Sequence, residues 1–393
     1  MWNIMSDAFG FSNEDCEDIP STMSLKDFFN TKLKYSTSDP DERDLIMLLV
    51  EAWGGFIGDV WEKQSLKWFW MEECLNGENL FVTETHEAIL QRVAASALQH
   101  AEIQLSTKAK SIEGKREGDE DPSVIVWTEN HVFEFDEVVV TVPTGCLKSG
   151  TPSFVPAIPR QVKQAIEAWS YSSLEKVYIA FPSAFWESRA TMSQSQEMGA
   201  SVLELHSPSF VQFLRPTYVP EEQKFWPIEP ISLSSGEPFG DQARPTLLFS
   251  IYGPCANHVT SLTKALSPTS SEYFDTINEF FRPYYSLLPG YEVNRPECMP
   301  TAVLATNWQN DELAGNGAYT NFKVNEDTSE EEWIRRDESI RSLREGLPDR
   351  GIWFAGEHTA PFIAVGTSTG AYWSGEVAAT KILGANGLLE RRH

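Results

Sequence analysis

The chain has 393 residues, of which 41% are hydrophobic and 12% aromatic, enough apolar material for a large core and two predicted domains. Its formal net charge is −26, from 31 Lys and Arg against 57 Asp and Glu, which opposes nucleic acids and anionic membranes as partners. A solvated acidic surface is the commoner cause of such a charge, and attraction of cationic substrates is the alternative. The five cysteines include no Cys-x-x-Cys pair, so neither a zinc site nor a disulfide framework is predicted.

The start of the chain and its hydropathy bear on the compartment. Met1–Ala8 have neither a basic start nor an apolar run, so no signal peptide is expected there. No stretch approaches the ~18 apolar residues of a membrane span. We expect a soluble protein, cytoplasmic or peroxisomal rather than secreted, unless a targeting segment precedes Met1.

Residues 1–75 have the amphipathic pattern of helices. One helix begins within residues 24–29. A second is predicted over residues 40–50, with Asp39 as its N-cap and a proline at its first position. Gly54–Gly55 interrupt the pattern. The sequence therefore predicts a packed helical lobe.

Residues 78–150 alternate short apolar runs with turn residues, which is typical of a sheet with short connections. A strand over 78–83 leads through a turn into a helix over 87–94. The other predicted strands are 103–109, 111–112, 124–127, 132–135 and 138–142, of which the third and fourth form a hairpin and the last is a buried strand of the parallel type.

Residues 151–340 mix helices and strands without an internal repeat. The predicted elements are a helix over 160–169, strands over 175–181 and 246–251, a helix over 272–281, and surface loops over 220–243 and 261–271.

The C-terminal part has the clearest strand–loop–helix pattern. Residues 352–355 predict a short buried strand, and Thr367 and Ser368 are good N-cap residues for a helix with a stop at Gly384. The first N–H groups and the positive dipole end of that helix would face whatever lies beyond the strand. An electron-rich, anion-forming ring suits this place, although an ordinary α/β unit without a ligand has the same pattern.

Residues 354–359, 366–371 and 374–375 closely resemble the C-terminal FAD motif of the flavin-containing amine oxidases, among which the polyamine oxidases of fungi and plants are the most similar subgroup. The resemblance implies an α/β fold in which a Rossmann-like FAD/NAD(P)-binding domain is interleaved with a substrate domain of mixed sheet and helices. The cofactor-binding residues that it implies here are Gly356, Glu357, Gly366, Thr367 and Ser368, with Glu357 by the ribityl–pyrophosphate part and Thr367 and Ser368 at the pyrimidine edge of the ring.

Two further segments are similar to the same family. Residues 139–145 resemble a strand that passes the cofactor, which implies that the backbone at Ala109 holds the adenine end of FAD and that Val142 lies near the cofactor. Trp308 lies in a loop that resembles the tryptophan-containing loop of the family, where it would pack by the flavin ring and exclude water. A buried loop tryptophan without such a role is the alternative.

Lys176 is the sharpest single candidate for catalysis. It lies inside the apolar strand 175–181, where an unpaired ammonium is costly to bury and where burial depresses its pKa. On the residues alone, an edge strand from which the ammonium reaches water is the commoner explanation. However, residues 173–182 resemble the segment that carries the flavin-facing lysine of the family, which binds a water beside the reactive nitrogen of the ring.

The sequence departs from the family at its front. Family members begin with a strand, a Gly-x-Gly-x-x-Gly turn and a helix that seat the FAD pyrophosphate, and no Gly-x-Gly-x-x-Gly occurs in the 393 residues. The chain begins where the substrate-domain helices of the family begin, so we expect an N-terminally incomplete FAD domain and weak or absent FAD binding. The predicted division is 1–77 (helical part of the substrate domain), 78–150 (FAD-binding segment), 151–340 (sheet part of the substrate domain) and 341–393 (C-terminal FAD-binding segment).

The resemblance implies an FAD-dependent amine oxidase that converts an amine, expected to be a polyamine, to an imine and then an aldehyde while dioxygen is reduced to hydrogen peroxide. The expected partners are a small-molecule amine and dioxygen, with no nucleic acid, membrane or metal, and the oligomeric state stays open. Two alternatives remain. One is a non-catalytic remnant that binds no FAD, and the other is a flavin oxidase of an amino acid or a secondary metabolite.

Overall fold

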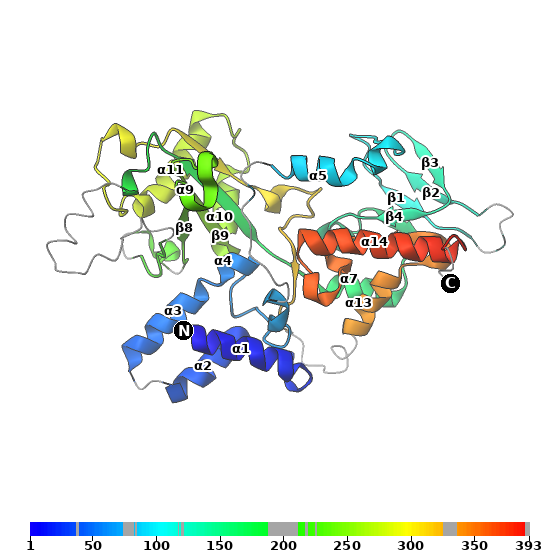
Figure 1. Cartoon of the computed structure of the whole chain (residues 1–393), viewed down its shortest axis with the longest axis horizontal. Coiled ribbons are helices and arrows are strands. Elements are labelled where there is room, and N and C mark those ends of the chain that lie inside the picture. Colours follow the sequence, from blue (N-terminus) through cyan, green and yellow to red (C-terminus); the bar gives the residue numbers. More distant parts are fainter. Residues whose placement is uncertain are drawn as a thin grey trace.

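Three clusters of buried side chains organise the chain into three lobes (Figure 1). Their mixture of helices and sheets confirms the predicted α/β class. This computed structural model describes residues 1–36, 39–73, 82, 85–116, 118, 122–187, 211–216, 219–224, 226–324 and 336–389.

The first lobe is the predicted helical one, drawn in blue in Figure 1. The Asp39 side chain accepts the N–H of Asp41 at 2.9 Å, so the expected N-cap is confirmed. Gly54–Gly55 do not interrupt the lobe but begin a short helix. A Cβ at Gly54 would lie 2.2 Å from the Tyr252 ring, so only glycine permits this close approach. The helices are α1 (Trp2–Glu14), α2 (Leu25–Ser36), α3 (Pro40–Glu51) and α4 (Gly54–Ile57).

The second lobe is a four-stranded antiparallel sheet in the order β10-β7-β9-β8, with two helices packed on one face. The region 220–243 is not loop throughout, because it contains β8 and α9. The region 261–271 begins inside α10, where the Thr263 hydroxyl bonds to the Val259 carbonyl and continues the helix. The elements are β7 (Leu174–Ala180), β8 (Glu229–Ser232), α9 (Gly236–Phe239), β9 (Thr246–Tyr252), α10 (Gly253–Thr263), α11 (Ser271–Tyr285) and β10 (Ala302–Ala305).

The third lobe joins segments from the middle and the end of the chain. The expected hairpin forms, and its sheet has the order β3-β2-β1-β5. β4, predicted as a strand of the parallel type, pairs in parallel with β12. Its elements are α5 (Glu87–Ala94), β1 (Ser111–Glu113), β2 (Val124–Trp127), β3 (Val132–Phe135), β4 (Val138–Val140), α6 (Thr144–Lys148), β5 (Ser153–Val155), α7 (Arg160–Ala168), α13 (Arg336–Glu345), β12 (Ile352–Phe354) and α14 (Ser368–Ala385), and a two-stranded ribbon, β6 (Ser170–Tyr171) with β11 (Thr320–Asn321), connects it to the other lobes.

Two predicted elements of this lobe are wrong. Residues 103–109 are not a strand, since Ile103 and Leu105 are exposed and only the short β1 pairs with neighbours. Gly384 does not end α14, which runs to Ala385, and the left-handed backbone that stops a helix is supplied by Gly387, at φ +67°. Most of the predicted strand 78–83 lies outside the described residues.

The glycines of α14 show how closely this helix approaches the loop before it. A Cβ at Gly370 would lie 1.9 Å from the Ala364 carbonyl oxygen, whereas a Cβ at Gly375 would meet no atom within 4 Å. The helix can therefore approach the loop only because Gly370 has no side chain.

An ion pair and two hydrogen bonds meet at the Glu137 carboxylate, at the edge of the same lobe. Lys115 lies 2.8 Å away and the Trp353 indole N–H donates to it at 2.6 Å. Partial burial raises the pKa of Glu137, but the hydrogen bonds from Lys115, Trp353 and Asn386 outweigh burial, so its pKa lies below the usual value.

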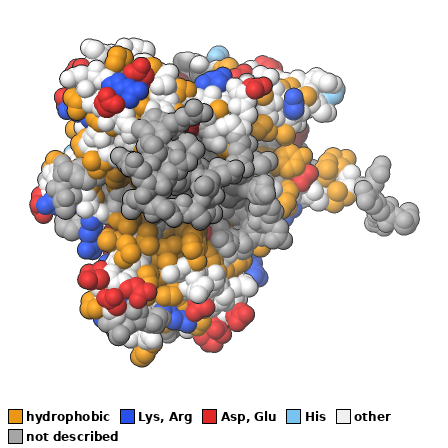
Figure 2. Space-filling model, turned by 60° about the vertical axis from the view of Figure 1, so that its left-hand side comes forward, with side chains coloured by type: hydrophobic (Ala, Val, Ile, Leu, Met, Phe, Trp, Pro, Cys, Tyr) orange, Lys and Arg blue, Asp and Glu red, His pale blue; other side chains and the backbone are white. Residues whose placement is uncertain are grey.

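The surface is mixed in character. Figure 2 shows acidic and basic side chains on the outer faces and a band of hydrophobic side chains between them, next to residues that are not described. Within the described part of the chain, no helix is long and apolar enough to cross a membrane. The same residues contain no group of three or more His, Cys, Asp and Glu side chains that could hold a metal ion.

Candidate functional site

The predicted strand–loop–helix at the C-terminus is present. All residues of β12 are buried, and the loop after it begins at Gly356, whose N–H donates to the Ser374 hydroxyl of α14 at 2.8 Å. The Thr367 hydroxyl accepts the N–H of Gly370 at 2.9 Å, which confirms Thr367 as the N-cap. Ser368 follows as the first, exposed residue of the helix, so its polar group faces outward at the positive end of the dipole.

Glu357 connects this loop to β11. One carboxylate oxygen accepts the Thr320 hydroxyl at 2.6 Å and the Thr320 N–H at 3.2 Å, and the other accepts the Gly366 N–H at 3.1 Å. Burial raises the pKa of Glu357, and these hydrogen bonds act in the opposite direction. The Thr320 hydroxyl also meets the Thr144 hydroxyl at 2.9 Å, just beyond Val142. Glu357 thus ties β11, through Thr320, to the backbone just before α14, through Gly366.

Lys176 lies in the middle of the sheet lobe. An edge-strand position is wrong, because β7 is flanked by β10 and β9. Its neighbours Val177 and Ile179 are buried, with Val177 pointing to the opposite face. The half-buried Lys176 ammonium donates to the Ser250 hydroxyl on β9 at 2.7 Å. Burial lowers the pKa of Lys176, and the charge of Glu229 partly opposes that shift.

A cavity of about 410 Å³ lies in front of Lys176. Its wall is mostly apolar, with a few polar groups, and it runs between the sheet and the residues around α4. This is the usual composition of a small-molecule site. The residues that line the cavity include Phe56, Lys176, Gln212, Glu229, Ser250 and Tyr252.

The loop that carries Trp308 is tied to the Lys176 strand. The buried Glu175 carboxylate accepts the Thr306 hydroxyl and, at 3.1 Å, the N–H of Gln309. The Thr306 hydroxyl in turn accepts the N–H of Lys176 at 2.8 Å. Trp308 itself is 45% exposed, so it is not the buried loop residue that both interpretations of it expect.

Tyr319 joins the cavity to the C-terminal loop. Its hydroxyl donates to the carbonyl of Phe56, a residue of the cavity wall. The Tyr319 ring lies so near Gly366 that a Cβ there would be 3.1 Å from it, and Gly366 has φ +75°. Glycine is therefore required at position 366 both for the backbone and for the approach of the ring.

Two predicted cofactor residues lie farther along the third lobe. Ala109 is half-buried in the segment that leads into β1, where the next N–H, of Lys110, donates to Trp127 at 2.7 Å. Val142 is half-buried after β4, and packs on the buried cluster of this lobe. The structure thus brings Val142 near the Thr320–Glu357 contact through Thr144, whereas Ala109 lies two residues before β1, outside its strand.

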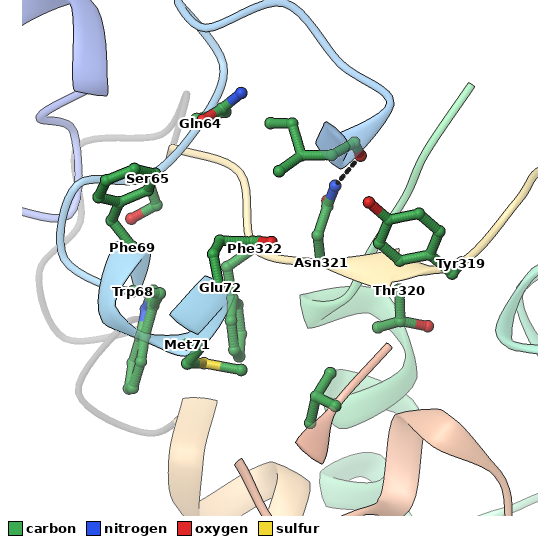
Figure 3. Close-up of a pocket in the computed structure, with 12 residues that line it drawn as sticks. Gln64, Ser65, Trp68, Phe69, Met71, Glu72, Tyr319, Thr320, Asn321 and Phe322 are labelled. Carbon is green, nitrogen blue, oxygen red and sulfur yellow. Dashed lines mark hydrogen bonds between the residues drawn. The ribbon is translucent and has the colours of Figure 1, made fainter. Parts of the chain in front are cut away.

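A second, smaller pocket lies beside β11, and no motif in the sequence indicates it (Figure 3). Its volume is about 40 Å³, the size of a water site, and it lies between Trp68, Glu72 and residues 319–322, which include β11. Both polar atoms of the buried Gln64 side chain lack a hydrogen-bond partner among the described residues. Glu229 and Gln212 were missed too, since the segment containing Glu229 was predicted as a loop.

The residues around the start of α14 fit the ring end of a flavin. The Gly366 backbone permits close approach, and the first N–H groups of α14 have no partner within the helix. Trp308 is exposed on the loop that is tied to β7. A pyrophosphate needs a different feature, a glycine-rich turn at a helix N-terminus, and the printed sequence contains no Gly-x-Gly-x-x-Gly.

The similarity to known proteins extends beyond these motifs. One relative is "Lysine-specific histone demethylase 1 homolog 1" of Oryza sativa subsp. japonica, 43% identical over 65 residues, 16% of this chain and 8% of that protein. "Protein FLOWERING LOCUS D" of Arabidopsis thaliana is 41% identical over 63 residues, again 16% of this chain and 8% of the relative. "Probable polyamine oxidase 4" of Arabidopsis thaliana is 28% identical over 123 residues, 31% of this chain and 23% of the relative.

The matched segments span between 8% and 23% of the length of these three relatives. A family model covers far more, since the flavin containing amine oxidoreductases match residues 11–383. FAD is the cofactor of that family. The chain therefore belongs to the flavin containing amine oxidoreductases.

Proposed function

We propose that this protein is an FAD-dependent amine oxidase that acts on a small amine, with a polyamine as substrate. The single observation that carries the proposal is the wall of the Lys176 cavity, which combines a mostly apolar surface with a half-buried lysine, a carboxylate and the Ser250 hydroxyl that accepts from the lysine. FAD, when bound, takes a hydride from the carbon beside an amine nitrogen and passes the electrons to dioxygen, so that an imine and hydrogen peroxide form. Water then converts the imine to an aldehyde.

Lys176 is proposed as the catalytic residue. Because burial lowers the pKa of its ammonium, it can exchange a proton with a bound water more readily than a surface lysine. Its hydrogen bond to Ser250 fixes the side chain toward the cavity. We propose that Lys176 holds the water that hydrolyses the imine and assists proton steps during reoxidation.

The remaining predicted residues are proposed to bind and orient the cofactor. Thr367 and Ser368 would face the pyrimidine edge, where the positive end of α14 stabilises negative charge. Trp308 would cover the ring and exclude water. Gly356, Glu357 and Gly366 would shape the loop between them, and Ala109 and Val142 would lie along the rest of FAD.

The test is a spectrum followed by an activity assay. The purified protein is incubated with FAD, freed of unbound flavin, and mixed with spermidine, spermine, neutral amino acids or a methylated lysine peptide while peroxide is recorded. The printed sequence is expected to retain little FAD without a Gly-x-Gly-x-x-Gly turn, so the assay is run on a longer chain that carries such a turn at its front, and there we expect a flavin band and peroxide release with the polyamines. Release with amino acids alone would replace the substrate class, and activity on the peptide alone would favour the chemistry named for the demethylase relatives. A protein that retains no flavin would be the non-catalytic remnant.

A further inference from the structure

Three polar side chains form a row across the sheet that backs the cavity. Lys176 of β7 is directly opposite Ser250 of β9, and Ser250 is directly opposite Glu229 of β8. Residues opposite one another on neighbouring strands point to the same face. All three line the cavity of about 410 Å³, so the row presents a cation, a hydroxyl and a carboxylate to one space.

Glu229 is held in place but is not neutralised. One carboxylate oxygen accepts the Gln212 amide at 2.7 Å, whereas the Lys176 ammonium is directed to Ser250. The ion pairs formed by the described residues do not include Glu229. An ionised carboxylate can accept about four hydrogen bonds, and the described residues supply one of them, from Gln212, to this residue of the cavity wall.

The surroundings make a cation the favoured occupant. The wall beside Glu229 includes Ile231 and Leu248, and burial raises the pKa of Glu229 while Gln212 and the charge of Lys176 lower it. A carboxylate in such a wall gains more from a bound ammonium than one in water does, because solvent screens the pair less. A neutral amine or an anion offers no such gain.

We propose that Glu229 binds a second, non-reacting ammonium of the substrate, so that the cavity selects amines with two charged nitrogens. This inference rests on the proposed function, because it places the reacting nitrogen beside Lys176. Two strand spacings of about 4.8 Å separate the backbones of Lys176 and Glu229, roughly 10 Å in all. The two nitrogens of a diamine can therefore lie apart, with the charged one at Glu229 and away from the Lys176 ammonium that repels it.

The test compares two ligands of the same chain length. Butane-1,4-diamine and butylamine are titrated calorimetrically into the FAD-loaded protein without dioxygen. We expect the wild type to bind the diamine at least about tenfold more tightly, as one charge-assisted hydrogen bond gives. In Glu229→Gln that preference should fall to within about threefold. The matched control is Glu279→Gln, the same chemical change at an exposed position of α11, behind the sheet, and it should leave the preference unchanged.

The outcomes separate this inference from the proposed function. A wild type without preference, or a Glu229→Gln variant that keeps it, overturns the role of Glu229 even if amines are oxidised. A preference lost in Glu229→Gln, in a protein that releases no peroxide with any amine, supports the site and overturns the oxidase. If Glu229→Gln unfolds, Glu229→Asp is titrated instead. It keeps the charge, so it should still favour the diamine, and equal binding of both ligands would again overturn the role.

Discussion

The change Lys176→Met tests whether the lysine in the cavity wall takes part in the reaction. Methionine approximates the aliphatic stem and removes the ammonium, so the packing of β7 should survive. The variant loses a 2.7 Å hydrogen bond from a charged donor to Ser250, a loss of about 1.5–3 kcal/mol, but it also removes a charge that burial disfavours. These contributions oppose each other, so we expect the free energy of unfolding to change by less than about 1.5 kcal/mol.

The lowered pKa of Lys176 also predicts how the free energy of unfolding changes with pH. Because the pKa of Lys176 is lowered in the folded state, the unfolded chain keeps its proton to higher pH. The free energy of unfolding should then rise as the pH rises from the folded pKa toward about 10.4, the value of a free lysine. Urea unfolding between pH 7 and pH 10 should show a shallower rise in Lys176→Met than in the wild type.

The kinetic result decides the role. In the FAD-loaded enzyme, we expect Lys176→Met to slow turnover at least about tenfold, the lower range for a group that assists proton transfer. Stopped flow measures flavin reduction and reoxidation separately, and Lys264→Met, at an exposed lysine after α10, serves as the control. Wild-type rates in both half-reactions, with flavin absorbance intact, would refute the assignment. Loss of flavin or of solubility would make Lys176 structural.

Three further predictions concern the loops that shape the site. Glu357→Ala leaves buried donors unpaired and should lower the free energy of unfolding by about 2–3 kcal/mol in urea titrations, and an unchanged midpoint would contradict its bridging role. Gly370→Ala should cost at least about 2 kcal/mol because its Cβ would overlap a carbonyl, whereas the control Gly375→Ala should stabilise α14 by about 0.5–1 kcal/mol; equal effects would refute the packing argument. Glu137 has a lowered folded pKa, so its contribution is present above about pH 4.3 and is lost as the pH falls through the folded pKa. Glu137→Gln should reduce the fall in urea midpoint between pH 6 and pH 3.5, and an unaltered fall would show that other carboxylates dominate.

The sequence predicts most reliably those elements that are stabilised by contacts between residues close together in the chain. The N-cap at Thr367 and the hairpin of β2 and β3 depend on residues a few positions apart, and both are confirmed. The strand predicted at 103–109 is wrong because apolar residues alone do not make a strand. A strand also needs a neighbour to pair with, and Ile103 and Leu105 remain exposed.

The candidate site depends even more on contacts between distant residues, which a local sequence pattern does not predict. Lys176 could be singled out because one charge in an apolar strand is unusual in any sequence. Glu229 could not, since it lies between Pro227 and Pro230 in a stretch whose composition predicts a loop, and its importance comes from the register of the strands. Only the pairing of β8 with β9 and of β9 with β7 sets it in line with Lys176. That alignment depends on pairings between residues 74 positions apart (Lys176 and Ser250) and 21 positions apart (Glu229 and Ser250), which no local pattern encodes. If the wild type binds the diamine more tightly than butylamine and Glu229→Gln does not, then the register of β8 sets the preference for the substrate, whereas the C-terminal motif is the part of the sequence that indicates the cofactor.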